Sequence, residues 1–257
     1  MDESVAIRRN TTNKPKVTGP GLNGTGFVCA AVDPAAPTGN NGCYTGPVSV
    51  TWGGFGDFGA SAYTTNGCED GQVGQGTVTR SCSVTTTAPP IFSSGDVSET
   101  VKRDSLAPVV SYSGNAGVYT VDRTVSIDCG ASDPSPGSGL ASDTCADVSA
   151  PAYTFSLGSH TLSASAEDVA GNVGSGSATF IVVVTFDSLK VLVARFSTDP
   201  DVTSGLNDKL NAAAKAKTAE QRAHLLQAFS NQVRAQTGKA LTEEQAAILL
   251  ELAEALE

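Results

Sequence analysis

The hydrophobic positions of the chain change their period near residue 185. Before it, apolar side chains alternate with small polar ones, as in VSVTW at residues 48–52. A period of two gives a β-strand one buried face and one wet face. After it, the apolar residues between 189 and 196 recur at steps of three and four, which places them on one face of a helix. The pattern predicts an all-β part followed by a helical part.

Two stretches of the all-β part share the strand pattern. In residues 38–104 we expect strands at 47–52, 77–84 and 97–101. In residues 105–185 we expect them at 109–112, 124–129, 153–156, 161–166 and 177–184. Val50 precedes Ile127 by 77 residues, and Cys68 precedes Cys145 by the same number, which indicates a repeat. Two β-sandwiches in tandem fit this pattern.

The two ends of the chain differ from these modules. Residues 1–37 are interrupted by prolines and glycines and are expected to be irregular, with one candidate edge strand at 27–30. Residues 186–257 are rich in Ala, Leu, Gln and Glu and predict a module of four short helices that need one another to be stable. Six residues are expected to share the core of that module: Leu192, Phe196, Leu210, Phe229, Val233 and Leu252.

Two short motifs connect the second β module with a known family. The D-x-x-A-P sequence at 104–108 and the A-x-D-x-A-G-N sequence at 166–172 resemble the bacterial Ig-like repeats of exported proteins. Residues 38–104 resemble a diverged copy that lacks the Ala-Gly-Asn hairpin. Residues 186–257 resemble the FIMAH-type helical module found at the C-terminal end of many bacterial surface proteins and secreted hydrolases. The resemblance implies immunoglobulin-like sandwiches in tandem plus a small all-α bundle, and it brings no catalytic residues.

Charge and hydropathy narrow the classes of partner. The formal net charge is -10, and the pairs Arg8-Arg9 and Lys102-Arg103 are too short to displace counterions from phosphate. We therefore expect no nucleic-acid partner. No run of 18 apolar residues is present, so we expect no membrane span. The first four residues do not resemble the start of a signal peptide, and we expect an exported parent protein to be longer.

All six cysteines lie in the all-β part: Cys29, Cys43, Cys68, Cys82, Cys129 and Cys145. Their even number and the lack of a CxxC pair favour disulfides and an oxidising compartment over zinc or redox sites. We expect Cys68–Cys82 and Cys129–Cys145 each to close a flexible loop of about 15 residues, worth roughly 3 kcal/mol in the chain-entropy description. Cys29–Cys43 would be the third bridge and is the least determined.

The sequence contains no recognisable catalytic constellation. His160 and His224 lie in different modules without a partner motif, so we expect structural roles for both. Glu167 and Asp168 are adjacent on a strand and point to opposite faces, which rules them out as paired glycosidase carboxylates. Asp168 is better explained as a hairpin residue that accepts backbone N–H bonds. We expect no enzyme activity, no catalytic residue and no cofactor.

Calcium is the one metal for which the acidic residues are candidate ligands. Hard oxygen donors lie in or near the loops of the all-β part: Asp104, Asp122, Asp128, Asp133, Asp143 and Asp147. None has the spacing of an EF-hand, and the loop at 133–139 offers a single carboxylate. No metal site is therefore assigned from the sequence, and calcium binding is left open.

Four aromatic residues near the first predicted strand are candidates for contact with a glycan: Trp52, Phe55, Phe58 and Tyr63. Aromatic rings exposed on one surface can stack on sugars. The simpler interpretation, which we favour, is that these rings fill the rim of a sandwich.

These observations predict a non-catalytic structural or adhesive region of a secreted or cell-surface bacterial protein, acting as spacer and interaction modules. We expect a monomer, located outside the cell or on its surface, whose partner is a glycan or a protein. Two alternatives stay open. The chain could be the accessory region of a secreted hydrolase whose catalytic domain lies elsewhere, or a carbohydrate-binding module.

Overall fold

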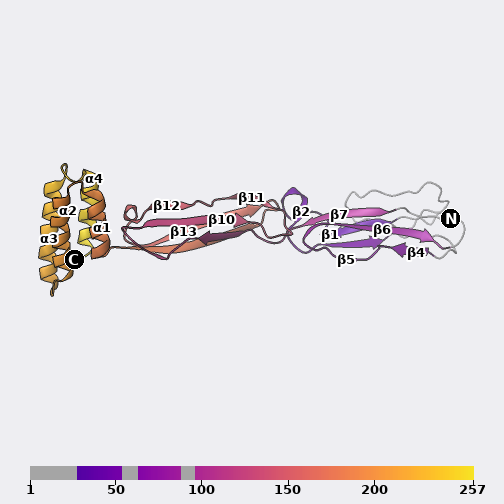
Figure 1. The fold of residues 1–257 in the computed structure, drawn as a ribbon. Helices are drawn as coiled ribbons and strands as arrows, with labels where there is room; N and C mark the ends of the chain where they lie inside the picture. The colour runs from indigo at the N-terminus through magenta and orange to yellow at the C-terminus, as the bar shows by residue number, and fades with distance from the viewer. Residues whose placement is uncertain (1–27, 54–62, 88–95) are drawn as a thin grey trace. The chain divides into compact units, whose positions relative to one another are not determined.

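The structure is a computed structural model that describes residues 28–53, 63–87 and 96–257 (Figure 1). By its internal contacts the chain splits into two compact units. The first contains Met1–Val110, Ala131–Thr144 and Ser165–Ser175, and the second contains Ser111–Gly130, Cys145–Ala164 and Gly176–Glu257. Each unit is described by itself below.

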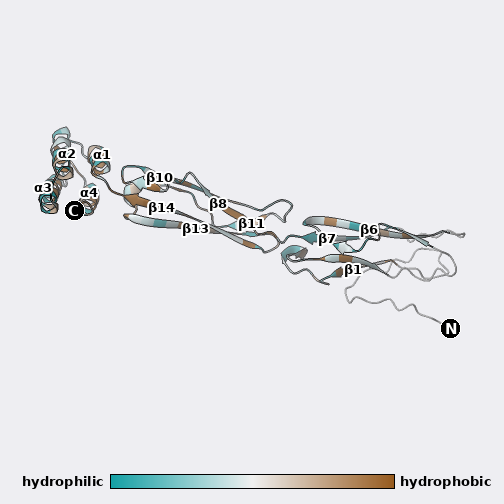
Figure 2. Ribbon diagram, turned by 90° about the horizontal axis from the view of Figure 1, so that it is seen from below, coloured by the Kyte–Doolittle hydropathy of each residue, from teal (hydrophilic) through white to brown (hydrophobic). Residues whose placement is uncertain are grey.

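Two small sheets form the sandwich of the first unit. One has the strand order β1-β3-β5, formed by Cys29–Asp33, Ser49–Gly53 and Gly71–Gln72. The other has the order β2-β7-β6-β4, formed by Cys43–Tyr44, Val97–Arg103, Gly76–Thr86 and Tyr63–Asn66. In β3, Val50 and Trp52 are buried and Thr51 is exposed, as the period of two predicts. Figure 2 shows the same alternation of hydrophobic and hydrophilic residues along β6.

The strands after residue 108 form two further sheets. One has the order β12-β10-β8, formed by Val148–Pro151, Thr124–Ser132 and Val109–Ser113. The other has the order β11-β13-β14-β9, formed by Leu140–Asp143, Gly158–Asp168, Val173–Val183 and Val118–Thr120. β9 pairs with β14 in parallel, as β2 does with β7. The parallel edge strand and the paired sheets give both modules an immunoglobulin-like build.

One predicted strand is wrong. Residues 153–156 were expected to be extended, but Ala152–Thr154 form a 3-10 turn, η2. Ala152 is fully buried, and the ring of Tyr153 packs edge-to-face on Phe196 with centroids 5.2 Å apart. The alternation of Tyr153 and Phe155 therefore reflects packing within the second unit and not strand pairing.

Four helices complete the second unit: α1 Phe186–Phe196, α2 Pro200–Ala214, α3 Ala219–Gln236 and α4 Glu243–Glu254. The six predicted core residues, from Leu192 to Leu252, are all buried in one cluster, which confirms their placement. Val125 and Phe180 of the sandwich strands belong to the same cluster. Among the described residues, no helix combines the length and the apolar character needed to span a membrane. The fold class of β-sandwiches plus a small helical bundle is thus as predicted.

Candidate metal centre

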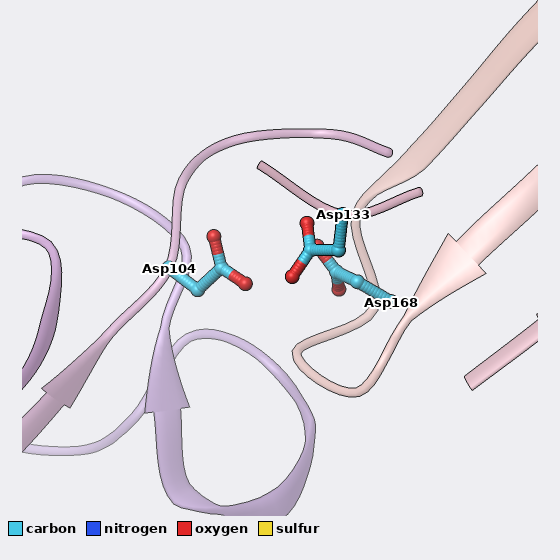
Figure 3. Close-up of side chains that lie close together, drawn as sticks. All are labelled: Asp104, Asp133 and Asp168. Atoms are coloured by element: carbon cyan, nitrogen blue, oxygen red, sulfur yellow. The ribbon is translucent and has the colours of Figure 1, made fainter. Parts of the chain in front are cut away.

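Three aspartates from separate segments of the first unit meet at one point. Asp104 follows β7, Asp133 follows β10, and Asp168 is the last residue of β13. One carboxylate oxygen of each lies within 4.8 Å of the others. Figure 3 shows the three side chains pointing toward one another. We call these three residues the carboxylate cluster.

Two members of the carboxylate cluster are buried, and each of their oxygens accepts a hydrogen bond. Asp104 and Asp168 are each only 1% exposed. Asp104 Oδ1 accepts from the Leu106 N–H (3.1 Å) and Oδ2 from the Ser138 N–H (2.6 Å). Asp168 Oδ1 and Oδ2 accept from the backbone N–H (2.8 Å) and side-chain amide (2.7 Å) of Asn172. Each oxygen therefore has a partner without any ion.

Asp133 differs from the other two. Its Oδ2 accepts from the Gly139 N–H at 2.7 Å, while its Oδ1 is buried with no hydrogen-bond partner among the described residues. The loop that follows is tightly wound, because a Cβ on Gly137 would collide with Asp133 Oδ2 and with Pro134 O. A buried acceptor without a partner costs about 1–3 kcal/mol. The unpartnered oxygen is what a bound cation would satisfy.

Neutral hydrogen bonds already hold the three segments together. Asn172 Nδ2 donates to Asp104 O at 3.0 Å, which ties the hairpin after β13 to the segment after β7. Ser138 Oγ accepts from the Ala170 N–H at 3.0 Å, which ties the same hairpin to the loop after β10. The positions of the carboxylates are therefore set before any ligand arrives.

Among the described residues, no ion pair neutralises the charge of the carboxylate cluster. Burial alone would raise the pKa of Asp104, but hydrogen bonds from Ser138 and Leu106, and one shared with Asp168, bring it below its usual value. Asp104 is consequently ionised at neutral pH. The ion pairs found in the described part of the chain involve none of the three aspartates. Like charges this close repel one another, and a bound cation would offset that repulsion.

The donor set fits a hard divalent cation. Carboxylate oxygens are the ligands that Ca²⁺ and Mg²⁺ prefer, whereas zinc sites use cysteine and histidine. Asp104, Asp133 and Asp168 would hold the ion, and its charge would compensate theirs. An ion there would also cross-link the three chain segments that carry them.

Sequence reasoning found only part of this centre. Of the six aspartates considered as calcium donors, the structure brings Asp104 and Asp133 together. Asp122, Asp128, Asp143 and Asp147 are not in the cluster; Asp147, for example, accepts from the Cys129 N–H. Asp168 has the predicted turn role, because it accepts the Asn172 N–H. Its place in the cluster was missed, although the buried Ala164 and Ala166 put it on the inward face of β13.

The other candidate catalytic residues have structural surroundings. His160 stacks on Phe180 with ring centroids 5.0 Å apart, and its Nε2 lies 2.7 Å from Ser156 O. His224 is exposed on α3. Glu167 is exposed while Asp168 is buried, so the two carboxylates face opposite sides of the strand as expected.

Two of the three expected disulfides are present, Cys68–Cys82 and Cys129–Cys145, with Cα atoms 4.5 and 5.3 Å apart. Cys43 is instead a free, buried thiol, so the Cys29–Cys43 bridge is not formed. The two residues belong to different sheets. Val32 lines the surface beside Tyr44, and the backbone of Cys29 begins β1 about 10 Å farther along the strand. Burial raises the pKa of the Cys43 thiol, which keeps it protonated.

The structure describes two of the four candidate glycan contacts, Trp52 and Tyr63, and only Tyr63 is exposed. Trp52 is only 7% exposed and belongs to the core of the first sandwich. Tyr63 is 45% exposed on β4. Phe55 and Phe58 lie outside the described residues.

Comparison with known proteins gives no family. No protein-family model matches the sequence, and no curated protein is similar to it. The fibronectin(III)-like modules of Clostridium thermocellum CbhA match 61% of this chain and 95% of that one at 11% identity, with a TM-score of 0.27. Extracellular cadherin domains 3-6 of protocadherin gamma B2 match 62% of this chain and 49% of that one at 16% identity, with a TM-score of 0.30. At these scores neither similarity supports an argument about function.

Proposed function

We propose that this chain is a non-catalytic structural or adhesive region of a secreted or cell-surface protein, stiffened by a calcium ion at the carboxylate cluster. The observation that carries the proposal is the buried, unpartnered Asp133 Oδ1 beside two buried carboxylates. The two disulfides support an oxidising location. Calcium sites of extracellular modules bind with a Kd of about 10⁻⁴–10⁻³ M.

The described residues favour a structural role over catalysis. Hydrolysis needs an acid, a base and a nucleophile that converge on one point. In the described part of the chain the clustered titratable groups are three carboxylates, and each oxygen of two of them already accepts a hydrogen bond. An ion held there compensates charge and fixes the segment that follows β7. The proposed role is therefore to hold the chain in a defined conformation.

The test is calcium-dependent stability of the intact chain. A ligand that binds only the folded state at ten times its Kd adds about 1.4 kcal/mol to the free energy of unfolding. We expect roughly 10 mM calcium to raise the unfolding midpoint relative to EDTA, followed through Trp52, the only tryptophan. Asp133→Ala should remove this shift, which is measured against the variant's own midpoint in EDTA, because the substitution deletes both the unsatisfied Oδ1 and the Oδ2 that accepts from the Gly139 N–H.

The matched control is Asp128→Ala, which removes an exposed carboxylate from β10. It should retain the full calcium shift. The proposal is wrong if calcium leaves the wild-type midpoint unchanged, or if Asp133→Ala responds to calcium as the wild type does.

A further inference from the structure

A short loop of the first unit has an unusual backbone. Residues 39–42, which we call the asparagine loop, are closed by a bond from the Gly39 N–H to Cys43 O at 3.0 Å. Within the loop, Asn41 has φ 53 and ψ 27, a left-handed conformation. Asparagine accepts that conformation more readily than most residues with a side chain.

The asparagine loop binds the turn of the hairpin between β13 and β14 (residues 168–172). The Asn40 N–H donates to Ala170 O at 2.8 Å. The Asn41 side-chain amide donates to Val169 O at 2.9 Å. Two consecutive carbonyls of the turn thus accept hydrogen bonds, one from a backbone donor and one from a side-chain donor. Asn41 and Val169 are 128 positions apart in the sequence.

The two segments touch backbone to backbone. A Cβ on Gly39 would lie 2.5 Å from Ala170 O, and a Cβ on Gly171 would lie 2.8 Å from Asn40 Nδ2. Both distances are shorter than real Cβ contacts. Gly39 is therefore needed because it meets backbone, whereas Gly171 meets only the Asn40 side chain and is favoured by its own φ of 93°.

The second module carries a copy of the loop that differs at the binding position. GNAGVYT at residues 114–120 repeats GNNGCYT at residues 39–45, and Ala116 stands where the first copy has Asn41. In the copy, Asn115 bonds Thr179 O and the Gly117 N–H, both of the same module. Val118 is 56% exposed, whereas the equivalent Cys43 is 5% exposed and lines a cavity of about 200 Å³ with Val169.

We propose that the asparagine loop is a docking surface for the turn of an Ala-Gly-Asn hairpin, that Asn41 selects this partner, and that the copy with Ala116 does not bind such a turn. The interaction uses neutral donors and carbonyls, so no cation is needed to form it. Its partner is a hairpin of the kind that the A-x-D-x-A-G-N sequence builds. A module would bind a following Ig-like module through this loop only where the loop carries asparagine.

The test measures hydrogen exchange of the Asn40 amide in the intact chain. The double variant Gly39→Ala/Thr45→Ser places a methyl group against Ala170 O while relieving its second contact, with the Thr45 methyl. Gly39 has φ -122 and ψ -171, so alanine is not strained there. We expect exchange of the Asn40 amide to accelerate at least about tenfold, with unchanged Trp52 emission as proof that the first sandwich remains folded.

Two further variants isolate the side-chain bond. Asn41→Gly allows the same left-handed backbone and removes the side chain whose amide donates to Val169 O, and we expect exchange about fivefold faster. Ala116→Asn is the matched control in the copy and should leave the Asn40 amide unaffected. All variants are compared with the wild type in EDTA, so that a cation at the carboxylate cluster cannot contribute to the protection, and protection of the wild-type amide in EDTA separates docking from cation binding. Free exchange of the wild-type Asn40 amide, or full protection in the double variant, would overturn the proposal.

Discussion

At the residue scale, the three clustered aspartates have different roles. Asp104 and Asp168 are satisfied by hydrogen bonds and would keep their positions without an ion. Asp133 has a buried oxygen that the described protein atoms leave without a partner. Residue type and loop position were sufficient to nominate Asp104 and Asp133 from the sequence. Their convergence could not be predicted, because it depends on how the hairpin and the loop fold back onto the segment after β7.

The lowered pKa of Asp104 predicts sensitivity of the first unit to acid. Since the pKa is lower in the folded than in the unfolded chain, the unfolded chain binds the proton more readily. The resulting stabilisation is complete above the ordinary pKa of about 3.9 and is lost as the pH falls through the folded value. We expect Asp104→Asn to flatten the decline in unfolding free energy below about pH 4, measured by urea unfolding through Trp52.

Asp128→Asn serves as the control for this prediction, since it removes the same formal charge from an exposed position on β10. It should retain the acid sensitivity of the wild type. Identical pH profiles for Asp104→Asn and the wild type would show that the hydrogen bonds to Asp104 contribute no pH-dependent stability.

At the element scale, periodicity predicted the long elements and missed the short ones. The long strands β6, β10, β13 and β14 and all four helices overlap the expected segments. β2, β5 and β9 have two or three residues each, too few for a period of two to be detected. Their existence depends on the neighbouring strand that binds them, as β7 binds β2.

Helix capping shows the same dependence on context. The capping box at Thr242 is complete, whereas at Thr218 only the side-chain half is formed, because Gln221 Oε1 accepts from the Lys217 N–H. A further box joins Thr185 and Ser188 at the start of α1. In this box serine takes the place of the usual Glu or Gln.

The helical core gives a prediction at this scale. Phe229 is fully buried on α3 among residues of the other helices. Phe229→Ala should lower the free energy of unfolding by about 3–5 kcal/mol, because it removes buried area and leaves a cavity. Val191→Ala on α1 is the matched control, since Val191 is 45% exposed, and should change it by less than about 0.5 kcal/mol. Equal effects in chemical denaturation followed by circular dichroism would contradict the placement of Phe229.

At the scale of the whole molecule, the modules are less independent than their sequences suggest. Within the second unit, sandwich residues such as Ile127 and Phe180 share one buried cluster with Leu192 and Phe229 of the helices. The Arg195 guanidinium also donates to Asp122 O at 2.9 Å. The sequence distinguishes the helical part from the β part, because the composition and the period of the apolar residues both change between them. It could not show that apolar side chains from both would be buried together.

The disulfides provide the prediction for the whole chain, since one lies in each unit. In the chain-entropy description, closing a loop of about 15 residues stabilises the folded state by roughly 3 kcal/mol. We expect Cys129→Ser/Cys145→Ser and Cys68→Ser/Cys82→Ser each to lower the free energy of unfolding by about that amount. The second pair should shift the transition seen by Trp52, which lies in the core of the first sandwich. Cys43→Ser is the control, because its thiol is free, and it should leave both bridges intact in non-reducing peptide maps. A map that pairs Cys43 with another cysteine, or that leaves Cys68, Cys82, Cys129 and Cys145 reduced in protein from an oxidising compartment, would contradict the structure and remove the main support for an extracellular location.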